Sequence, residues 1–156
     1  MGSPMDSTEI GARIGVTDLM ATYQFLVDAG KIRQAAELFV ADGVFQTELG
    51  EFVGPEGVLE FFRRTKDGFI GAGFLPARHY LSSVRVEPRP DGTAATYACF
   101  QYIGTRGLDH WGTYRDEAVE QDGRWLFARR RATVEGYVAG SPVPGILGLD
   151  PAGLSA

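Results

Sequence analysis

Apolar residues recur at helical spacing through the first third of the chain. Residues three and four apart lie on one face of a helix, so such stripes predict helices. The first stripe predicts a helix from about residue 8 to about residue 29, which Gly30 would end because glycine readily adopts the left-handed conformation found there. The second predicts a helix that ends near Asp42 and Gly43. The stripes comprise Val16, Leu19, Met20, Tyr23, Leu26 and Val27, then Ile32, Ala35, Ala36 and Phe39.

A short strand and a third helix are expected next. Residues 44–49 read as a strand, and Gly54 begins a helix that has Pro55 and Glu56 in its first turn. Proline is favoured there because the first amides of a helix have no helical partner, and the helix dipole attracts a carboxylate. The apolar face of this helix carries Val58, Phe61, Phe62 and Phe69.

After Pro76 the apolar residues recur with a period of two, which is typical of strands. Turn sequences at residues 90–92 and 122–123 separate the segments. The expected strands are 79–87, 93–104, 110–120 and 124–137. Three helices followed by a meandering antiparallel sheet predict an α+β fold in one domain over residues 6–138. A strongly curved sheet around the long first helix would leave an apolar pocket for a small molecule.

The two ends of the chain differ from this pattern. Residues 1–5 resemble a cloning remnant and are excluded from fold reasoning. Residues 139–156 are rich in glycine and proline, yet they carry more apolar side chains than a solvated tail usually has. We expect this tail to cover the mouth of the pocket or to pack on a partner subunit. Its apolar residues include Val143, Ile146, Leu147, Leu149 and Leu154.

Composition narrows the function classes. A net charge of −5 disfavours nucleic acid or an anionic membrane as a partner, and no apolar run is long enough to span a membrane. Strand alternation would divide Arg129, Arg130 and Arg131 between two faces of a sheet. Cys99 is the only cysteine, which excludes an intramolecular disulfide and a multi-cysteine zinc site. No clustered ligand set suggests a metal or another cofactor, and cytoplasmic residence is expected.

The chain has only two histidines, His79 and His110. A carboxylate beside an imidazole fixes its tautomer and raises its basicity, so Asp28 and His79 together would form a proton-transfer base. Two interpretations stay open for His79, a strand-edge histidine or a catalytic one. Tyr23 is a core aromatic or a catalytic hydroxyl. Tyr23 and Asp28 lie about 140° apart on a regular helix, so both reach one pocket only if the helix ends or bends near Asp28.

Further candidates lie on the later strands. His110 could be a second pocket histidine, although a surface or loop-edge position is favoured. Alternation places Trp125, Phe127, Arg129 and Arg131 on one side of the last strand. A buried arginine beside aromatic rings needs an anionic partner, so Arg129 would bind a substrate oxygen or pair with Asp28. The expected substrate-binding residues are Phe61, Trp125, Phe127 and His110.

The order of motifs resembles the NTF2-like superfamily, and within it the SnoaL-like group. The resemblance covers about residues 10 to 138, and it rests on motif order and spacing. The motifs are Ile14-x3-Asp18-Leu19-x3-Tyr23-x4-Asp28, Leu38-Phe39-x2-Asp42-Gly43-Val44-Phe45, Gly54-Pro55-Glu56-Gly57, Arg78-His79-Tyr80 and Asp122-Gly123-Arg124-Trp125.

This resemblance implies a cone-shaped α+β barrel, often dimeric, with a deep pocket. The most similar branch includes scytalone dehydratase, bile-acid 7α-dehydratase and hexachlorocyclohexane dehydrochlorinase, which perform eliminations without a cofactor. By position, Asp28 and His79 match the dyad of that branch, Tyr23 matches the tyrosine of the dehydratases, and Arg129 matches a pocket arginine of the dehydrochlorinase. The dehydrochlorinase lacks the tyrosine, which makes halide elimination the weaker expectation.

The expected function is therefore a dehydratase-type lyase that acts on a small hydrophobic cyclic or polyketide-like substrate. Two alternatives stay open. The same dyad could serve an isomerase or a cyclase, or the domain could bind a small molecule without chemistry, because one fold hosts many functions. A homodimer through the outer face of the sheet is also expected.

Overall fold

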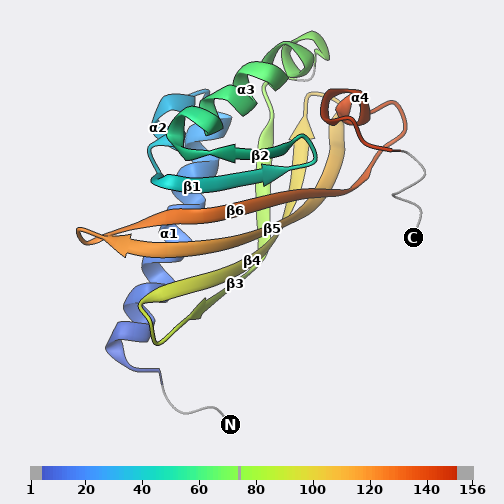
Figure 1. The fold of residues 1–156 in the computed structure, drawn as a ribbon. Helices are drawn as coiled ribbons and strands as arrows, with labels where there is room; N and C mark the ends of the chain where they lie inside the picture. Colours follow the sequence, from blue (N-terminus) through green and yellow to red (C-terminus); the bar gives the residue numbers. More distant parts are fainter. Residues whose placement is uncertain (1–4, 74, 151–156) are drawn as a thin grey trace.

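The computed structural model describes residues 5–73 and 75–150, which form helices packed against one curved sheet (Figure 1). The elements are α1 (Ser7–Asp28), α2 (Ile32–Ala36), β1 (Phe39–Thr47), β2 (Gly50–Val53), α3 (Gly54–Gly71), β3 (Arg78–Pro88), β4 (Thr93–Gly104), β5 (Gly107–Gln121), β6 (Arg124–Tyr137) and α4 (Val143–Leu147). In Figure 1 the long helix α1 passes behind β5 and β6. The expected α+β class is confirmed.

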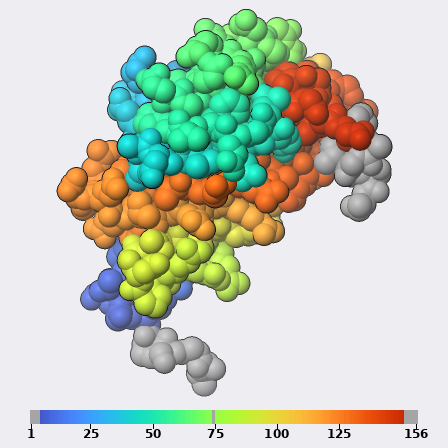
Figure 2. Space-filling view, in the orientation of Figure 1, coloured from blue at the N-terminus to red at the C-terminus, as the bar shows by residue number. Residues whose placement is uncertain are grey.

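The six strands form a single open sheet in the order β2-β1-β6-β5-β4-β3. β1 runs parallel to β6, and every other neighbouring pair is antiparallel. The sheet curves strongly without closing, and α1 lies along it while α3 lies across one end (Figure 1). In the space-filling view, α3, β1 and β2 form one continuous surface beside α4 (Figure 2).

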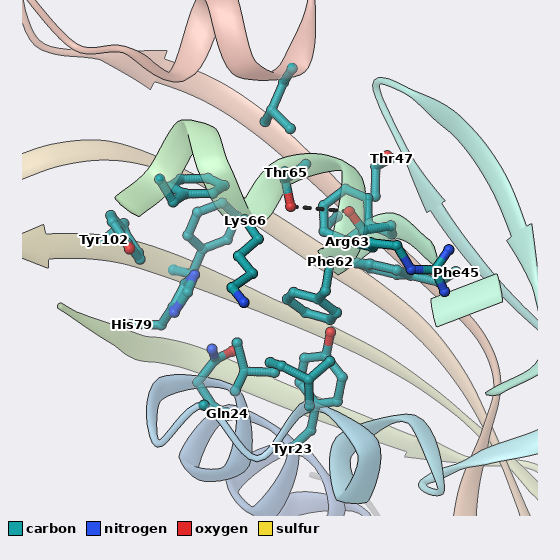
Figure 3. A pocket seen from close by; sticks show the side chains of 18 of the residues that line it. Tyr23, Gln24, Phe45, Thr47, Phe62, Arg63, Thr65, Lys66, His79 and Tyr102 are labelled. Carbon is teal, nitrogen blue, oxygen red and sulfur yellow. Dashed lines mark hydrogen bonds between the residues drawn. The ribbon is translucent and has the colours of Figure 1, made fainter. Parts of the chain in front are cut away.

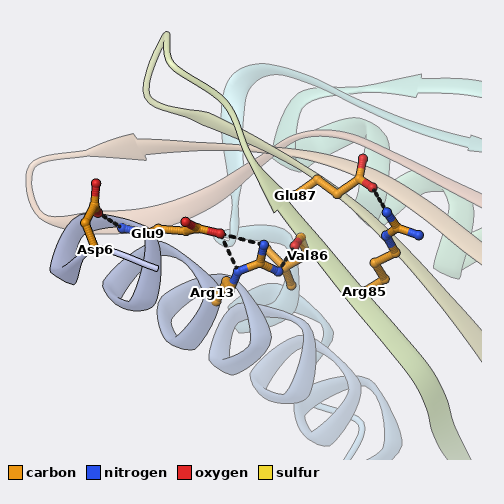
Figure 4. Close-up of polar contacts among 6 residues, drawn as sticks. All are labelled: Asp6, Glu9, Arg13, Arg85, Val86 and Glu87. Carbon is orange, nitrogen blue, oxygen red and sulfur yellow. Dashed lines mark hydrogen bonds and ion pairs between the residues drawn. The ribbon is translucent and has the colours of Figure 1, made fainter. Parts of the chain in front are cut away.

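The first helix is held at both ends by side chains. Asp6 accepts a hydrogen bond of 2.8 Å from the amide of Glu9, which satisfies one of the free donors at the helix start. Arg13 pairs with Glu9 at 2.8 Å and also donates to the carbonyl of Val86 on β3, so α1 is tied to the sheet edge (Figure 4). The far end of the helix, at Asp28, is tied to the same strand, as described below.

Two local features differ from the prediction: one helix is shorter than expected, and one strand was not expected. The second helix was expected to continue to about Asp42, but α2 ends at Ala36 and Phe39 begins β1. Phe39 pairs with Phe127 of β6, and the two rings pack 5.2 Å apart in the core. This tertiary pairing outweighs the helical spacing of a short segment. The strand β2 was not predicted.

Over the described residues, the strand pairings contain five register shifts, and two of them, on β6 and β3, change which side chains point inward. Ala118 pairs with Phe127 while Glu117 pairs with Arg129, so Ala128 is an extra residue on β6. A second bulge lies on β3, where Ser82 pairs with Cys99 and Arg85 pairs with Tyr97. Each bulge reverses the alternation beyond it, because one residue is inserted into a period of two.

The tail beyond β6 returns to the domain. Val143 of α4 is fully buried, and Leu147 lines the cavity described below. Ile146 packs against Gly68 of α3, since a Cβ at that glycine would meet its Cγ1 at 2.8 Å. Leu154 lies outside the described residues, as does the expected cloning remnant apart from Met5.

Candidate active site

A cavity of about 630 Å³ lies between α1, α3 and the inner face of the sheet (Figure 3). This volume is in the range of pockets that bind small organic ligands. One part is aromatic and aliphatic, and the other carries most of the groups able to exchange protons. The apolar part includes Phe45, Leu59, Phe61, Phe62 and Leu147, and the polar part includes Tyr23, Gln24, His79, Tyr102, His110 and Tyr114.

The structure brings Asp28 and His79 into direct contact at the polar part. The Asp28 Oδ1 atom lies 2.7 Å from Nδ1 of His79, and its Oδ2 atom accepts a 3.0 Å hydrogen bond from the His79 backbone amide. Only 9% of the Asp28 side chain and 15% of the His79 side chain is exposed. A carboxylate can only accept, so Nδ1 carries the proton and Nε2 is left as the basic atom.

The ends of two elements explain this contact. Asp28 is the last residue of α1, and His79 is the second residue of β3. Tyr23 and Asp28 can reach one pocket only if the helix ends or bends near Asp28, and α1 does end at Asp28. Tyr23, from the preceding turn, lines the same cavity. Burial raises the pKa of Tyr23 far above its usual value, so its hydroxyl stays protonated and can donate a hydrogen bond.

Arg129 does not reach the cavity, which corrects its predicted place. Its Nη1 atom contacts Glu51 and Gln46, each at 2.9 Å, and it is not among the lining residues. Arg131 is also exposed, whereas Arg130 is completely buried. The bulge at Ala128 is the reason, because it turns Arg130 to the side that already carries Phe127.

Arg130 is buried behind the cavity wall, where it packs against aromatic rings. Its guanidinium lies over the rings of Tyr23, Tyr114 and Phe127, at 4.4, 4.0 and 4.7 Å from their centroids. Its Nη1 atom lies 3.6 Å from Oδ2 of Asp116, and both side chains are fully inaccessible. A buried arginine therefore does have an anionic partner, as expected, but that partner is not Asp28. Burial raises the pKa of Asp116, and the charge of Arg130 opposes this rise.

His110 is a second cavity histidine, so the favoured surface position was wrong. It is 4% exposed, and its Nδ1 atom lies 2.8 Å from Oδ2 of Asp109. The same carboxylate oxygen accepts a 2.8 Å hydrogen bond from Ser141. The ring of Tyr102 lies 4.6 Å from the His79 ring and 4.8 Å from the His110 ring. Burial lowers the pKa of His110, although Asp109 opposes this effect.

The remaining predicted binding residues divide between cavity and core. Phe61 lines the cavity. Phe127 is fully buried and packs on Tyr23 and Phe39, so it supports the site from behind. Trp125 covers Gly15 of α1, where a Cβ atom would lie 2.5 Å from its ring, and neither Phe127 nor Trp125 lines the cavity.

Sequence reasoning missed several lining residues. Gln24, Tyr102 and Tyr114 face the polar part, and Lys66 of α3 extends into the space near His79 and Gln24 (Figure 3). Gln24 had a signal, because it is a polar residue on the otherwise apolar stripe of α1. Tyr102 and Tyr114 alternate with outward residues on adjacent strands, which does not distinguish a cavity wall from the core.

The structure also bears on metal and membrane sites. Over residues 5–73 and 75–150, no three side chains of histidine, cysteine, aspartate or glutamate gather in a way that could hold a metal ion. No helix in those ranges is long and apolar enough to cross a membrane.

Comparison with known proteins agrees with this architecture. The family model described as SnoaL-like domain matches residues 8–131. No curated protein sequence matches the chain. Among solved structures, a protein of unknown function with a cystatin-like fold from Nostoc punctiforme PCC 73102 is 16% identical, with a TM-score of 0.72 over 90% of this chain and 99% of that one.

Two further solved structures carry names that refer to enzymes. Hexachlorocyclohexane dehydrochlorinase LinA-type3 from Novosphingobium barchaimii LL02 is 20% identical, with a TM-score of 0.71 over 87% of this chain and 96% of that one. A scytalone dehydratase-like protein from Novosphingobium aromaticivorans DSM 12444 is 23% identical, with a TM-score of 0.67 over 83% and 88%. At such identities the likeness shows a shared fold.

Proposed function

The chain belongs to the family of SnoaL-like domains, and on that premise we propose that it is a lyase that removes water from a hydrophobic cyclic substrate. The observation that carries the proposal is the contact between Asp28 and His79 at the polar part of an otherwise apolar cavity. A passive pocket does not need an imidazole that is held in one tautomer by a nearly buried carboxylate.

The proposed reaction begins with proton removal from a carbon next to a carbonyl. Nε2 of His79 takes this proton, and the electron pair of the C–H bond moves toward the carbonyl oxygen. Asp28 keeps the ring oriented and stabilises the imidazolium ion that forms. The hydroxyl of Tyr23, which stays protonated because of its raised pKa, donates to the developing oxyanion.

Loss of the leaving group completes the elimination. The electron pair returns from the oxyanion to form a carbon–carbon double bond, the C–O bond to the β-hydroxyl breaks, and the departing oxygen takes the proton from His79 as water leaves. No electrons are exchanged with an outside group, so the step requires no oxidant or reductant. The aromatic side chains of Phe61 and Phe62 add apolar surface to the cavity, and a bound substrate that displaces water from it would strengthen these polar contacts.

His110 has a supporting part in this proposal. Its lowered pKa keeps the ring neutral near pH 7, and its Nδ1–H donates to Asp109. The other nitrogen is then an acceptor, which can receive a hydrogen bond from a substrate hydroxyl. One alternative uses the same base: His79 removes a proton and returns it elsewhere on the substrate, which is an isomerisation.

The test is kinetic. Cyclic β-hydroxy ketones and polyketide-like alcohols are incubated with chelator-treated protein, and products are identified by mass spectrometry. Elimination lowers the substrate mass by one water, whereas isomerisation conserves it. His79→Ala should reduce turnover by about 10²- to 10⁴-fold, as expected for loss of a general base. Near-normal turnover in this variant, or dependence on a metal, would show that the mechanism is wrong.

A binding module without chemistry makes the opposite prediction for the same variant. His79→Ala would then leave both ligand affinity and biological activity nearly unchanged. Circular dichroism checks that the His79→Ala variant is folded like the wild type. A large loss of turnover with retained ligand binding rejects the passive module.

We also propose a homodimer through the outer face of the sheet. Tyr80 and Trp111 are 57% and 38% exposed, and both pair with Gln101, so they form one row across β3, β4 and β5. Exposed apolar side chains that adjoin one another mark interaction surfaces. Trp111→Glu should shift the protein to monomers in light scattering, whereas Phe25→Glu on the exposed side of α1 should not.

A further inference from the structure

One buried polar side chain in the cavity has no role in the reaction proposed above. Gln24 is 5% exposed and lines the cavity, yet neither its Nε2 nor its Oε1 atom has a hydrogen-bond partner among the described residues. Figure 3 shows the amide directed into the cavity, toward the side where His79 lies. Both halves of the amide are thus buried beside the cavity without a hydrogen bond in the described part of the chain.

This arrangement is costly for the folded protein alone. Burying an amide without a partner loses its hydrogen bonds to water and gains none in return. Gln24 occupies the stripe of α1 that otherwise buries Val16, Leu19, Met20 and Tyr23. Leucine or methionine would fill this position without the penalty. A polar residue that breaks the local pattern with no compensation in the protein indicates a functional site.

The helix α1 places this amide on the same side as Asp28, which holds the proposed base His79. Gln24 and Asp28 are four residues apart, so they share a face of α1 and are separated by a rise of about 6 Å along its axis. Asp28 holds the ring of His79. A ligand whose carbon meets Nε2 of His79 can therefore reach Gln24 with a substituent on the same small ring system.

We propose that Gln24 recognises a hydroxyl group on the ring of the substrate. The Nε2 atom donates to the hydroxyl oxygen, and Oε1 accepts the hydroxyl hydrogen, so one substituent satisfies both halves of the amide. A carbon-bound halogen supplies no donor for Oε1, and an unsubstituted ring satisfies neither atom. The inference deepens the proposed function, because it makes hydroxylated rings the preferred ligands of the site.

Equilibrium binding tests the inference without turnover. The probes are 2-naphthol and naphthalene, which differ by one hydroxyl group, and binding is followed by naphthyl fluorescence. The wild-type protein should prefer 2-naphthol by at least about tenfold, since a site with unpaired polar groups discriminates against a ligand that lacks the matching group. In Gln24→Leu this preference should fall several-fold, because only the other polar side chains of the cavity remain to bind the hydroxyl, while the affinity for naphthalene is kept or increased.

Thermal unfolding of the ligand-free protein provides the second readout. Gln24→Leu should unfold at the same temperature as the wild type or higher, because the variant removes an unpaired buried amide. Gln121→Leu, at an exposed position in the β5–β6 hairpin, is the matched control and should change neither readout. Gln24→Met repeats the test with an unbranched side chain in case leucine packs poorly.

The inference is overturned if both Gln24 variants keep the preference for 2-naphthol. It is also overturned if both lower the unfolding temperature while the control does not, since the amide would then have a structural role. His79→Ala separates this inference from the proposed reaction. If that variant keeps turnover, the reaction is wrong and the hydroxyl recognition by Gln24 still stands on the binding data.

Discussion

The two histidine–carboxylate pairs of this protein have nearly equal hydrogen bonds and different surroundings. Nδ1 of His79 lies 2.7 Å from Asp28, and Nδ1 of His110 lies 2.8 Å from Asp109. The first pair joins residues 51 positions apart, from a helix end and a strand start, whereas the second joins neighbours on β5. The His79 side chain is 15% exposed and that of His110 is 5% exposed.

The difference teaches that a short hydrogen bond alone does not define a general base. Burial lowers the pKa of His110, and a positive charge on His79, once it has taken a proton, would lower it further. A ring that resists protonation is suited to accept a hydrogen bond and poorly suited to take a proton from carbon. His79 has more access to the cavity and a carboxylate that also binds its backbone amide, so we assign proton removal to it.

The largest expected effect comes from exchanging the two carboxylates for amides. Asp28→Asn should reduce turnover by about 10²- to 10⁴-fold, because the amide neither fixes the productive tautomer nor stabilises the imidazolium ion. Asp109→Asn should cost less than about tenfold, because its histidine stays neutral. Steady-state kinetics on the substrate found by the screen measures both. Equal losses in the two variants would contradict the division of roles.

The next effect concerns stability. Asp28→Ala should lower the free energy of unfolding by about 1–3 kcal/mol, because the amide of His79 loses its acceptor and α1 loses its tie to β3. Asp28→Asn should lower it less, since its side-chain oxygen can still accept from that amide. Urea denaturation compares the variants. If Asp28→Ala and the wild type have equal free energies of unfolding, the contact between Asp28 and His79 does not stabilise the fold.

The smallest effect is a pH dependence that distinguishes His110. Its pKa lies below the ordinary value of 6.5 in the folded protein, so the unfolded chain binds more protons below pH 6.5. Stability should therefore be complete above pH 6.5 and should fall as the pH drops below that value toward the folded pKa. Urea denaturation at several pH values between about 5 and about 7.5 measures how the free energy of unfolding changes with pH.

A variant and a direct titration complete this test. His110→Phe should flatten the slope, because the titrating group is removed. In an NMR titration the His110 ring should change its chemical shift below pH 6.5. A His110 midpoint above that value would reverse the sign of the dependence and remove the argument for a neutral ring.

Much of the fold was predictable because its signals are local. The helical stripe up to Val27 predicted a helix from about residue 8 to about residue 29, close to α1 at Ser7–Asp28, and alternating residues with turn signals predicted β3 to β6. The boundary of α2 was not predictable, because Phe39 leaves the helical pattern only through its pairing with Phe127. The spacing of apolar residues within a short segment does not predict pairing with a strand that is distant in the sequence.

The site shows the same division. The family spacing selected Asp28, His79 and Tyr23, and the structure brings the first two together and places the third in the same cavity. The same spacing selected Arg129, which lies outside the cavity. The position of His110 at the start of a predicted strand favoured a surface or loop-edge place, but His110 is buried against Phe100 and Tyr102 of β4.

The sequence by itself determined the first and third helices and the strands β3 to β6, and it selected the carboxylate and the histidine that stand at the ends of α1 and β3. Only the tertiary structure decided that Arg130 is the inward arginine and that the amide of Gln24 has no partner in the described chain. The physical reason is that periodicity describes each element in isolation. A bulge such as that at Ala128 arises between paired strands, and an unpaired buried amide is defined by everything that surrounds it.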